Sequence, residues 1–266
     1  MTGSRSIKAA TLVGAIIALA TAGLGQGAGT WTRGTPLPSS RTEVTGAELG
    51  GRLYVIGGFG QGGDLVEVYD PRAARWEGRA PLPAPLHHAA AVVVGARLYV
   101  VGGYSGGQWG VQDTMLEYDP GADRWEPRAP LPVPRDHHAA GVVGGKLHVV
   151  GGRLEGSYAR NLDAHHVYDP ATNSWTAGPP LPTARSGIAA AVLGSRLFVF
   201  GGEAPSGTFG QVEVYDASTN RWATLTPMPT PRHGLTAVAF EGRIHVLSGG
   251  PQPGGSYSSA HEVLSP

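Results

Sequence analysis

The chain has 266 residues, a formal net charge of zero and no cysteine. This length allows one large all-β domain or two small domains. Without cysteine, disulfides and thiolate chemistry are excluded, and without a basic run, nucleic acid or an anionic membrane surface is disfavoured as a partner.

The first predicted element is a secretory signal peptide over residues 1–22. Arg5 and Lys8 precede an uncharged, mostly apolar stretch at residues 9–20, and Ala20-Thr21-Ala22 offers small residues for cleavage. The alternative is an uncleaved membrane anchor, but the apolar run is shorter than the ~20 residues that a spanning helix needs. We therefore expect an extracytoplasmic protein, secreted or periplasmic, with no membrane insertion after cleavage. Residues 23–29 are Gly-rich and read as a flexible leader.

One pattern recurs down the rest of the chain. In the first copy, Leu53-Tyr54-Val55-Ile56 leads to Gly57-Gly58, and Tyr69 is followed by Trp76 seven residues later. The double glycine returns at Gly102-Gly103, Gly151-Gly152, Gly201-Gly202 and Gly249-Gly250. The aromatic step returns as Tyr118 to Trp125, Tyr168 to Trp175 and Tyr215 to Trp222. Such a repeat unit cannot bury its apolar face alone, which removes the two-domain option.

A repeat of about 50 residues with these features resembles the kelch family, and the resemblance covers nearly all of the chain after residue 30. It implies an all-β fold, a kelch-type β-propeller over residues 30–266. Counting the copies gives five blades, although known kelch proteins mostly have six or seven. The motif is specific for the fold and does not name an activity.

The two ends of the repeat region carry complementary defects. Trp31 has no upstream apolar run or double glycine, whereas the last copy ends at Glu262-Val263-Leu264 without a Trp. Ring closure by strand exchange would pair the strand around Trp31 with the strand around Val263, and otherwise two strand edges would stay unpaired. We expect deletion of residues 30–38 to open the ring.

The strands of a blade are labelled a to d from the channel outward, and binding residues are expected in the loops that vary. In a four-stranded meander the b–c and d–a connections share one face, and the b–c connections vary most in length and content. They supply the candidate ligand-binding residues Tyr104, Trp109 and Arg153. Trp109 is the tryptophan that does not fit the repeat, and it either binds ligand or packs over a neighbouring blade.

The d–a connections reach the same face and repeat an arginine. Arg41, Arg135, Arg185 and Arg232 share one position of the repeat, where the second copy has Leu86. As a collar at the channel mouth they would grip carboxylates, and arginines at similar places contact acidic ligands in the kelch family. A residue that recurs in four blades is also explained by bonds to the backbone of the next blade.

Two residues after this position, the alignment places Glu43 together with His88 and His137. Imidazole and carboxylate suit zinc or iron, but the spacing follows the repeat and is not a ligand motif. We therefore predict ligand-binding residues here and neither a metal site nor a cofactor.

Three functions are consistent with the sequence. The first is a monomeric, non-catalytic module that recognises a protein segment or a glycan on the b–c and d–a face. The second is a carbohydrate-active enzyme resembling the periplasmic sialic-acid mutarotases, in which Glu43 or Glu155 with Arg135 or Arg153 would act as an acid–base pair. A copper-radical oxidase is excluded because its cofactor needs a cysteine. The third is a structural subunit of a larger assembly.

Overall fold

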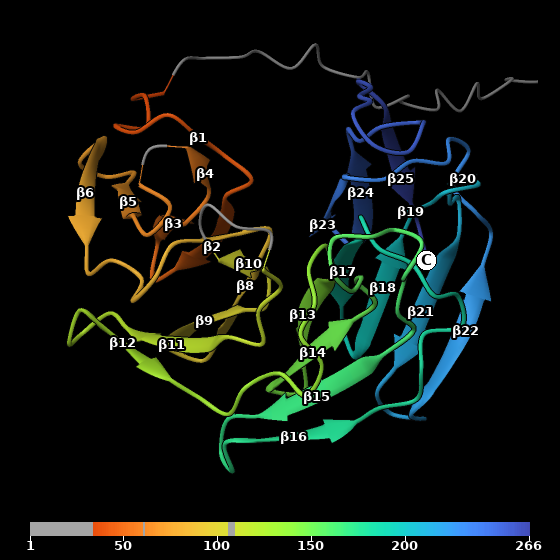
Figure 1. Cartoon of the computed structure of the whole chain (residues 1–266), viewed down its shortest axis with the longest axis horizontal. Helices are drawn as coiled ribbons and strands as arrows, with labels where there is room; N and C mark the ends of the chain where they lie inside the picture. Colours follow the sequence, from red (N-terminus) through yellow and green to blue (C-terminus); the bar gives the residue numbers. More distant parts are fainter. Residues whose placement is uncertain (1–33, 61, 106–109) are drawn as a thin grey trace, which may run out of the picture. The chain divides into compact units, whose positions relative to one another are not determined.

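The computed structural model describes residues 34–60, 62–105 and 110–266, and the fold lies within Thr35–Pro266. These residues form five antiparallel sheets in chain order, the blades of a five-bladed β-propeller (Figure 1). The predicted all-β class and blade count are therefore confirmed. The described residues form strands and turns but no helix, so none of them belongs to a helix able to cross a membrane.

Each blade is a meander whose strands lie side by side in sequence order. Blade 1 has β2 (Thr45–Leu49), β3 (Arg52–Ile56), β5 (Val66–Asp70) and β6 (Arg75–Arg79). Blade 2 has β8 (Ala90–Val94), β9 (Arg97–Val101), β11 (Met115–Asp119) and β12 (Arg124–Pro127). Blade 3 has β13 (Ala139–Val143), β14 (Lys146–Val150), β15 (His165–Asp169) and β16 (Ser174–Ala177). Blade 4 has β17 (Ala189–Leu193), β18 (Arg196–Phe200), β21 (Val212–Asp216) and β22 (Arg221–Leu225). Blade 5 has β23 (Thr236–Phe240), β24 (Arg243–Leu247) and β25 (His261–Leu264).

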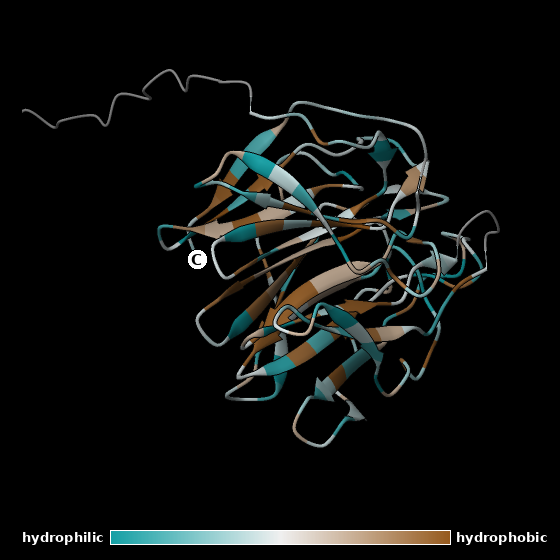
Figure 2. Cartoon of the chain, turned by 90° about the vertical axis from the view of Figure 1, so that its left-hand side faces the viewer, coloured by the Kyte–Doolittle hydropathy of each residue, from teal (hydrophilic) through white to brown (hydrophobic). Residues whose placement is uncertain are grey.

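The core lies between successive blades, because each sheet is apolar on both faces. Four hydrophobic clusters fill the four interfaces from blade 1 to blade 5, and Figure 2 shows hydrophobic residues running along the strands. The repeated Trp of strand d links the blades by a second means. Its indole N–H donates to a carbonyl of the linker that leaves the preceding blade, as Trp125 does to Ala80 at 2.9 Å and Trp175 to Ala129 at 2.8 Å.

The double glycine allows strand b to approach the next blade closely. Gly102 has a φ of 63°, and a Cβ on it would lie 2.8 Å from the carbonyl oxygen of Arg135. The amide of Gly103 donates to that same oxygen at 2.9 Å. A side chain at this step would separate blades 2 and 3, which explains why each repeat places glycine there.

The turn between strands c and d contains a residue with positive φ in the first four blades. In blades 2 to 4 this residue is Asp123, Asn173 or Asn220, and its side chain accepts a hydrogen bond from the repeated Tyr hydroxyl at 2.6–2.8 Å. Blade 1 has Ala74 there, with a φ of 49° and no side-chain oxygen to offer Tyr69.

Three two-stranded ribbons position the loops at one end of the propeller. They are β1 (Arg41–Thr42) with β4 (Phe59–Gly60), β7 (Leu86–His87) with β10 (Tyr104–Ser105), and β19 (Glu203–Ala204) with β20 (Gly207–Thr208). The first two join the d–a linker that enters a blade to the b–c loop of the same blade, and single bridges from Asp136 to Arg153 and from Ser186 to Glu203 repeat this arrangement. The predicted sharing of one face by these connections is confirmed.

Blade 5 has three strands among the described residues. β25 pairs with β24 on one side, and no described strand pairs with its other edge. Trp31, which we expect to supply the fourth strand, lies outside the described residues, so closure of the ring stays a prediction.

Candidate functional site

A polar recess lies where the d–a linkers meet the b–c loops. We define it by Glu43, His88, His137, Arg153 and His233, which line two adjoining cavities of about 340 and 400 Å³. The linkers deliver Glu43, His88, His137 and His233, because each linker turns sharply just before strand a. Arg153 instead comes from the b–c loop of blade 3, where it bridges to Asp136 of the linker.

The turn uses a left-handed residue at the same place in all five linkers. The five residues are Glu43, His88, His137, Gly187 and Gly234, with φ between 51° and 66°. Glycine adopts this conformation at no steric cost, whereas a residue with a side chain is strained there. Blades 4 and 5 use glycine, but blades 1 to 3 hold a carboxylate and two imidazoles in the strained conformation. Strain of this kind concentrates at functional sites.

The three strained side chains meet one another. His88 Nε2 lies 3.3 Å from a Glu43 carboxylate oxygen, and the His88 and His137 rings lie 4.4 Å apart between centroids. Glu43 is about half exposed, so the recess is open on its side. The sequence alignment therefore placed these three residues correctly in space, and their role in ligand binding remains to be tested.

A chain of buried charges forms the wall of the recess. Arg153 Nε donates to Asp136 Oδ1 at 3.0 Å, and its NH1 donates to Glu203 Oε1 at 2.8 Å. Its NH2 contacts His137 Nε2 at 3.0 Å, and His137 Nδ1 lies 2.5 Å from Asp136 Oδ1. Because two carboxylates share its guanidinium, the Arg153 charge is already neutralised. The other Glu203 oxygen accepts from the Gly254 amide at 2.8 Å.

Burial controls the protonation of this region. It is the largest cause that lowers the pKa of His88, to about 3, and the nearby His137 and His87 lower it further. Burial alone would raise the pKa of Asp136, but hydrogen bonding and charge from His137, Tyr104 and Arg153 outweigh it and lower that pKa. Burial also raises the pKa of Tyr104, whose side chain is fully buried beside His88. His88 is therefore neutral and Asp136 ionised at neutral pH.

The four repeated arginines lie inside their blades. The side chains of Arg41, Arg135, Arg185 and Arg232 are fully buried. Arg41 shows the pattern, because it donates to the carbonyls of Gly57 and Leu65 and pairs with Glu67 at 2.6 Å. The bonds run to strands b and c of the arginine's own blade, whereas the structural interpretation of the sequence had assigned them to the next blade. Burial lowers the pKa of Arg135 and of Arg185 to about 10.

The partner of each arginine has a sequence signal that the alignment of arginines missed. The second residue of strand c is Glu67, Leu116, His166, Glu213 and Glu262 in blades 1 to 5. Three of the arginines pair with the Glu of their blade, at 2.6–3.0 Å, and Arg135 contacts His166. Blade 2 has Leu86 and Leu116, so both members of the pair change together.

The remaining candidates divide between the recess and other places. Trp109 lies outside the described residues. Glu155 is exposed and pairs with Arg160, and Arg135 is buried in its blade, so only Glu43 and Arg153 of the proposed acid–base groups line one cavity. In the part of the chain that the structure describes, no group of three or more His, Asp or Glu side chains could hold a metal ion.

Comparison with known proteins agrees with this architecture. The model of the KLHDC2/KLHL20/DRC7 Kelch-repeats domain matches residues 30–180 and 126–264. The chain belongs to the kelch-repeat family. No protein of curated function matches it.

The kelch propeller is also similar to solved structures. One of them, titled "Structure of YjhT", superposes with a TM-score of 0.71 at 21% identity, over 80% of this chain and 73% of that chain. At this identity the likeness shows the fold alone. The function of this kelch protein must therefore be argued from its own recess.

Proposed function

We propose that this protein is an exported binding module that takes a protein segment or a glycan into the polar recess. Kelch propellers generally mediate protein interactions. The observation that carries the proposal is the use of Glu43, His88 and His137 at left-handed positions, where blades 4 and 5 use glycine. Side chains retained at a conformational cost, and gathered around one cavity, indicate a role beyond folding.

The charges of the recess restrict its ligand. Arg153 is neutralised by Asp136 and Glu203, Glu43 adds a partly exposed negative charge, and His88 is neutral because of its low pKa. The recess therefore favours neutral or positively charged groups, such as sugar hydroxyls, peptide amides or a basic side chain. It disfavours a carboxylated ligand, because each arginine of the repeat is buried in its blade.

The fold itself supplies a variant that tests this proposal. His88→Gly/His137→Gly gives blades 2 and 3 the residue that blades 4 and 5 already have, so the backbone is expected to stay intact. We expect the full chain to bind members of a panel of neutral oligosaccharides and neutral or basic peptides, and the double variant to lose at least tenfold in affinity. Sialylated oligosaccharides and acidic peptides in the same panel should bind weakly. A panel ligand that binds the parent and the double variant with equal affinity would overturn the proposal. Tighter binding of the acidic members of the panel would overturn it as well.

Export is proposed on the sequence of residues 1–22, which lie outside the described residues. The mass of the mature protein, purified from cells that express the full gene, tests it. Loss of about 22 residues together with recovery outside the cytoplasm is the expected result, and an intact N-terminus would contradict it.

A carbohydrate-active enzyme is the second candidate, because Glu43 and Arg153 line the same cavity. Glu43 would act as the base, within reach of His88. Interconversion of sugar anomers, followed by NMR, is the test. An activity that Glu43→Gln leaves unchanged would remove Glu43 from this role, and no activity on a panel of free sugars would remove the candidate.

A further inference from the structure

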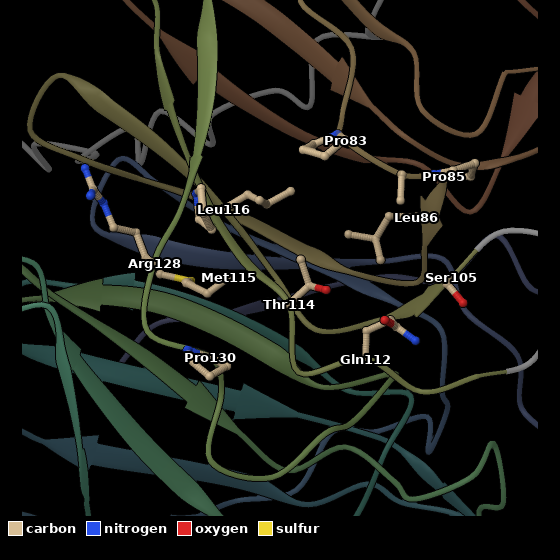
Figure 3. Close-up of a pocket in the computed structure, with 12 residues that line it drawn as sticks. Pro83, Pro85, Leu86, Ser105, Gln112, Thr114, Met115, Leu116, Arg128 and Pro130 are labelled. Carbon is tan, nitrogen blue, oxygen red and sulfur yellow. The ribbon is translucent and has the colours of Figure 1, made fainter.

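A second cavity opens on blade 2, outside the polar recess. Its volume is about 340 Å³, and it lies between residues 83–86, which lead into blade 2, and residues 127–130, which leave it. Residues 114–116 at the start of strand c form its floor. Figure 3 shows the two linkers on either side, with the side chains of Leu86, Met115 and Leu116 between them. We call this cavity the blade 2 groove.

The groove exists at the one blade that lacks the repeated arginine. In blade 3, the Arg135 guanidinium crosses from the linker to the carbonyl of Ala164, and in blade 1, Arg41 reaches the carbonyl of Leu65 in the same way. The corresponding carbonyl in blade 2 belongs to Thr114 and accepts from the Gly102 amide at 2.8 Å. The Leu86 side chain is too short to reach this carbonyl as an arginine does, and Leu116 replaces the acidic partner. The space that an ion pair fills in other blades is therefore a cavity lined by apolar groups in blade 2.

The walls of the groove are apolar and stiff. Four prolines line it, and their fixed φ angles and missing N–H groups limit collapse of the linkers onto the floor. The four are Pro83, Pro85, Pro127 and Pro130. Ser105, Gln112 and Thr114 place hydroxyl and amide groups at one end, as Figure 3 shows.

Among the described residues that line the groove, Arg128 is the charged one, and its guanidinium is already paired. Arg128 lies at its rim, but its Nε donates to Glu117 at 2.8 Å and its NH2 to Glu126 at 3.2 Å. The repeat's own ionic partners are replaced by Leu86 and Leu116. A charged side chain that entered here would lose its hydration without a counter-ion, which is costly.

We propose that the blade 2 groove binds one aliphatic or aromatic side chain of a partner polypeptide. The groove is partly open to solvent, so it can enclose a single side chain while the rest of the segment lies outside. A free small molecule is normally buried over most of its surface in its site, which this open shape does not provide. The Ser105 and Thr114 hydroxyls and the Gln112 side-chain oxygen would meet the backbone of the segment, whereas Gln112 Nε2 already donates to the carbonyl of Gly110 at 2.8 Å. This site is separate from the polar recess and does not depend on the function proposed for it.

The methionines provide a direct probe of this site. The chain has three: Met115 lines the groove, Met228 packs between blades 4 and 5, and Met1 lies in the predicted signal peptide. In protein with ¹³C-methyl methionine, we expect the blocked peptides Ac-Gly-Leu-Gly-NH₂ and Ac-Gly-Phe-Gly-NH₂ to shift the Met115 signal saturably at millimolar concentration. The Met228 signal should stay in place, and the Asp and Lys analogues should have no effect.

The matched variant is Leu86→Arg/Leu116→Glu, which gives blade 2 the ion pair of blades 1, 4 and 5 and is therefore compatible with the fold. We expect it to remove the peptide-induced shift while binding in the polar recess is unchanged. Should this variant unfold, the reverse exchange Arg185→Leu/Glu213→Leu in blade 4 is expected to create a second groove and a second saturable binding event, sensed by tryptophan fluorescence.

Three results would overturn the proposal. The first is a Met115 shift that benzyl alcohol produces and the peptides do not, which would assign the groove to small molecules. The second is a shift that persists in Leu86→Arg/Leu116→Glu. The third is a Met115 shift on Trp109→Gly without any peptide, which would show that the chain's own loop fills the groove.

Discussion

Among single residues, Ala74 shows how a repeated hydrogen bond can be lost without loss of the turn. Ala74 keeps the left-handed conformation of Asp123, Asn173 and Asn220 but has no oxygen for the Tyr hydroxyl of its blade. Asparagine tolerates this conformation better than alanine. We expect Ala74→Asn to raise the free energy of unfolding by about 1–2 kcal/mol, from lower strain and one new hydrogen bond to Tyr69. Urea unfolding measures the change, and the gain should shrink in a Tyr69→Phe background. An equal gain in both backgrounds would show that strain alone is responsible.

Arg185 of blade 4 tests whether the buried arginines stabilise the fold through their glutamate partners. Arg185→Leu leaves the Glu213 carboxylate 1% exposed and without its cation. We expect a loss of about 3–5 kcal/mol in the free energy of unfolding, because an unpaired buried charge remains. The double variant Arg185→Leu/Glu213→Leu should recover most of this loss, since blade 2 holds Leu86 and Leu116 at these positions. A double variant as unstable as the single one would mean that the arginine acts through its bonds to the backbone, such as the one to Val199.

Among whole elements, blades 4 and 5 offer a site for the strand that is predicted to close the ring. Between blades 2 and 3, Trp175 packs against a cluster that contains Val101, Met115, Leu131 and Val149. The corresponding residues between blades 4 and 5 are Phe200, Val212, Met228 and Val246, which line a cavity of about 210 Å³ together with Thr226 and Leu264. This cavity therefore has the lining of a tryptophan site.

Trp31 stands in the sequence where such a tryptophan is needed. It precedes Pro36 by five residues, the spacing of Trp76 to Pro81, and Thr35 accepts the indole N–H of Trp76 at 2.9 Å, as Ala80 accepts that of Trp125. We predict that Trp31→Ala lowers the free energy of unfolding by about 3–5 kcal/mol. Urea unfolding of the full chain provides the measurement. A variant with the stability of the parent would show that residues 30–33 do not complete blade 5.

At the scale of the molecule, buried histidines make stability depend on pH. His148 and His165 lie between blades 3 and 4, with Nδ1 of the first 2.9 Å from Nε2 of the second. Burial is the largest cause that lowers both pKa values, that of His148 to about 4. Unfolded histidines take up protons near pH 6.5, so between about pH 6.5 and the pKa of about 4 of folded His148 the unfolded state binds more protons at this residue than the folded state. The lowered pKa of His165 acts in the same direction. Stability is therefore complete above pH 6.5 and falls as the pH is lowered, by up to about 1.4 kcal/mol per pH unit for each such histidine.

Blade 4 supplies the control for this effect. Phe198 and Val212 occupy the positions of His148 and His165 in the repeat, so His148→Phe/His165→Val keeps residues that the fold already accommodates. Between pH 7 and pH 4, the melting temperature of this variant should decrease less than that of the parent. Equal decreases would place the pH dependence elsewhere, for example at the buried His138, whose pKa burial lowers to about 3.

The sequence alone was sufficient to predict the blades and the meeting of Glu43, His88 and His137, because both follow from the register of the repeat. The interior position of the arginines was not predictable in this way, since an aligned residue reveals its place along the chain and not the direction of its side chain. The recurring Glu67, Glu213 and Glu262 carried that information. The pairing of Arg153 with both Asp136 and Glu203 was not predictable, because these residue types stand at their positions in one copy of the repeat each. No recurring pattern in the sequence therefore indicates the contact.

The arginine pairs have a consequence for the ancestry of the chain. Each pair joins a linker to strand c of the same blade, within a stretch of about thirty residues, as in Arg232 with Glu262. A gene duplication that copied the unit of blade 1, 4 or 5 would therefore copy a complete, electrically balanced interior, and a deletion would remove one without leaving an unpaired charge elsewhere. The number of repeats can thus change between relatives without leaving buried charges unpaired. A paired substitution within one unit, as at Leu86 and Leu116, can open a cavity in that blade without disturbing the neighbouring blades.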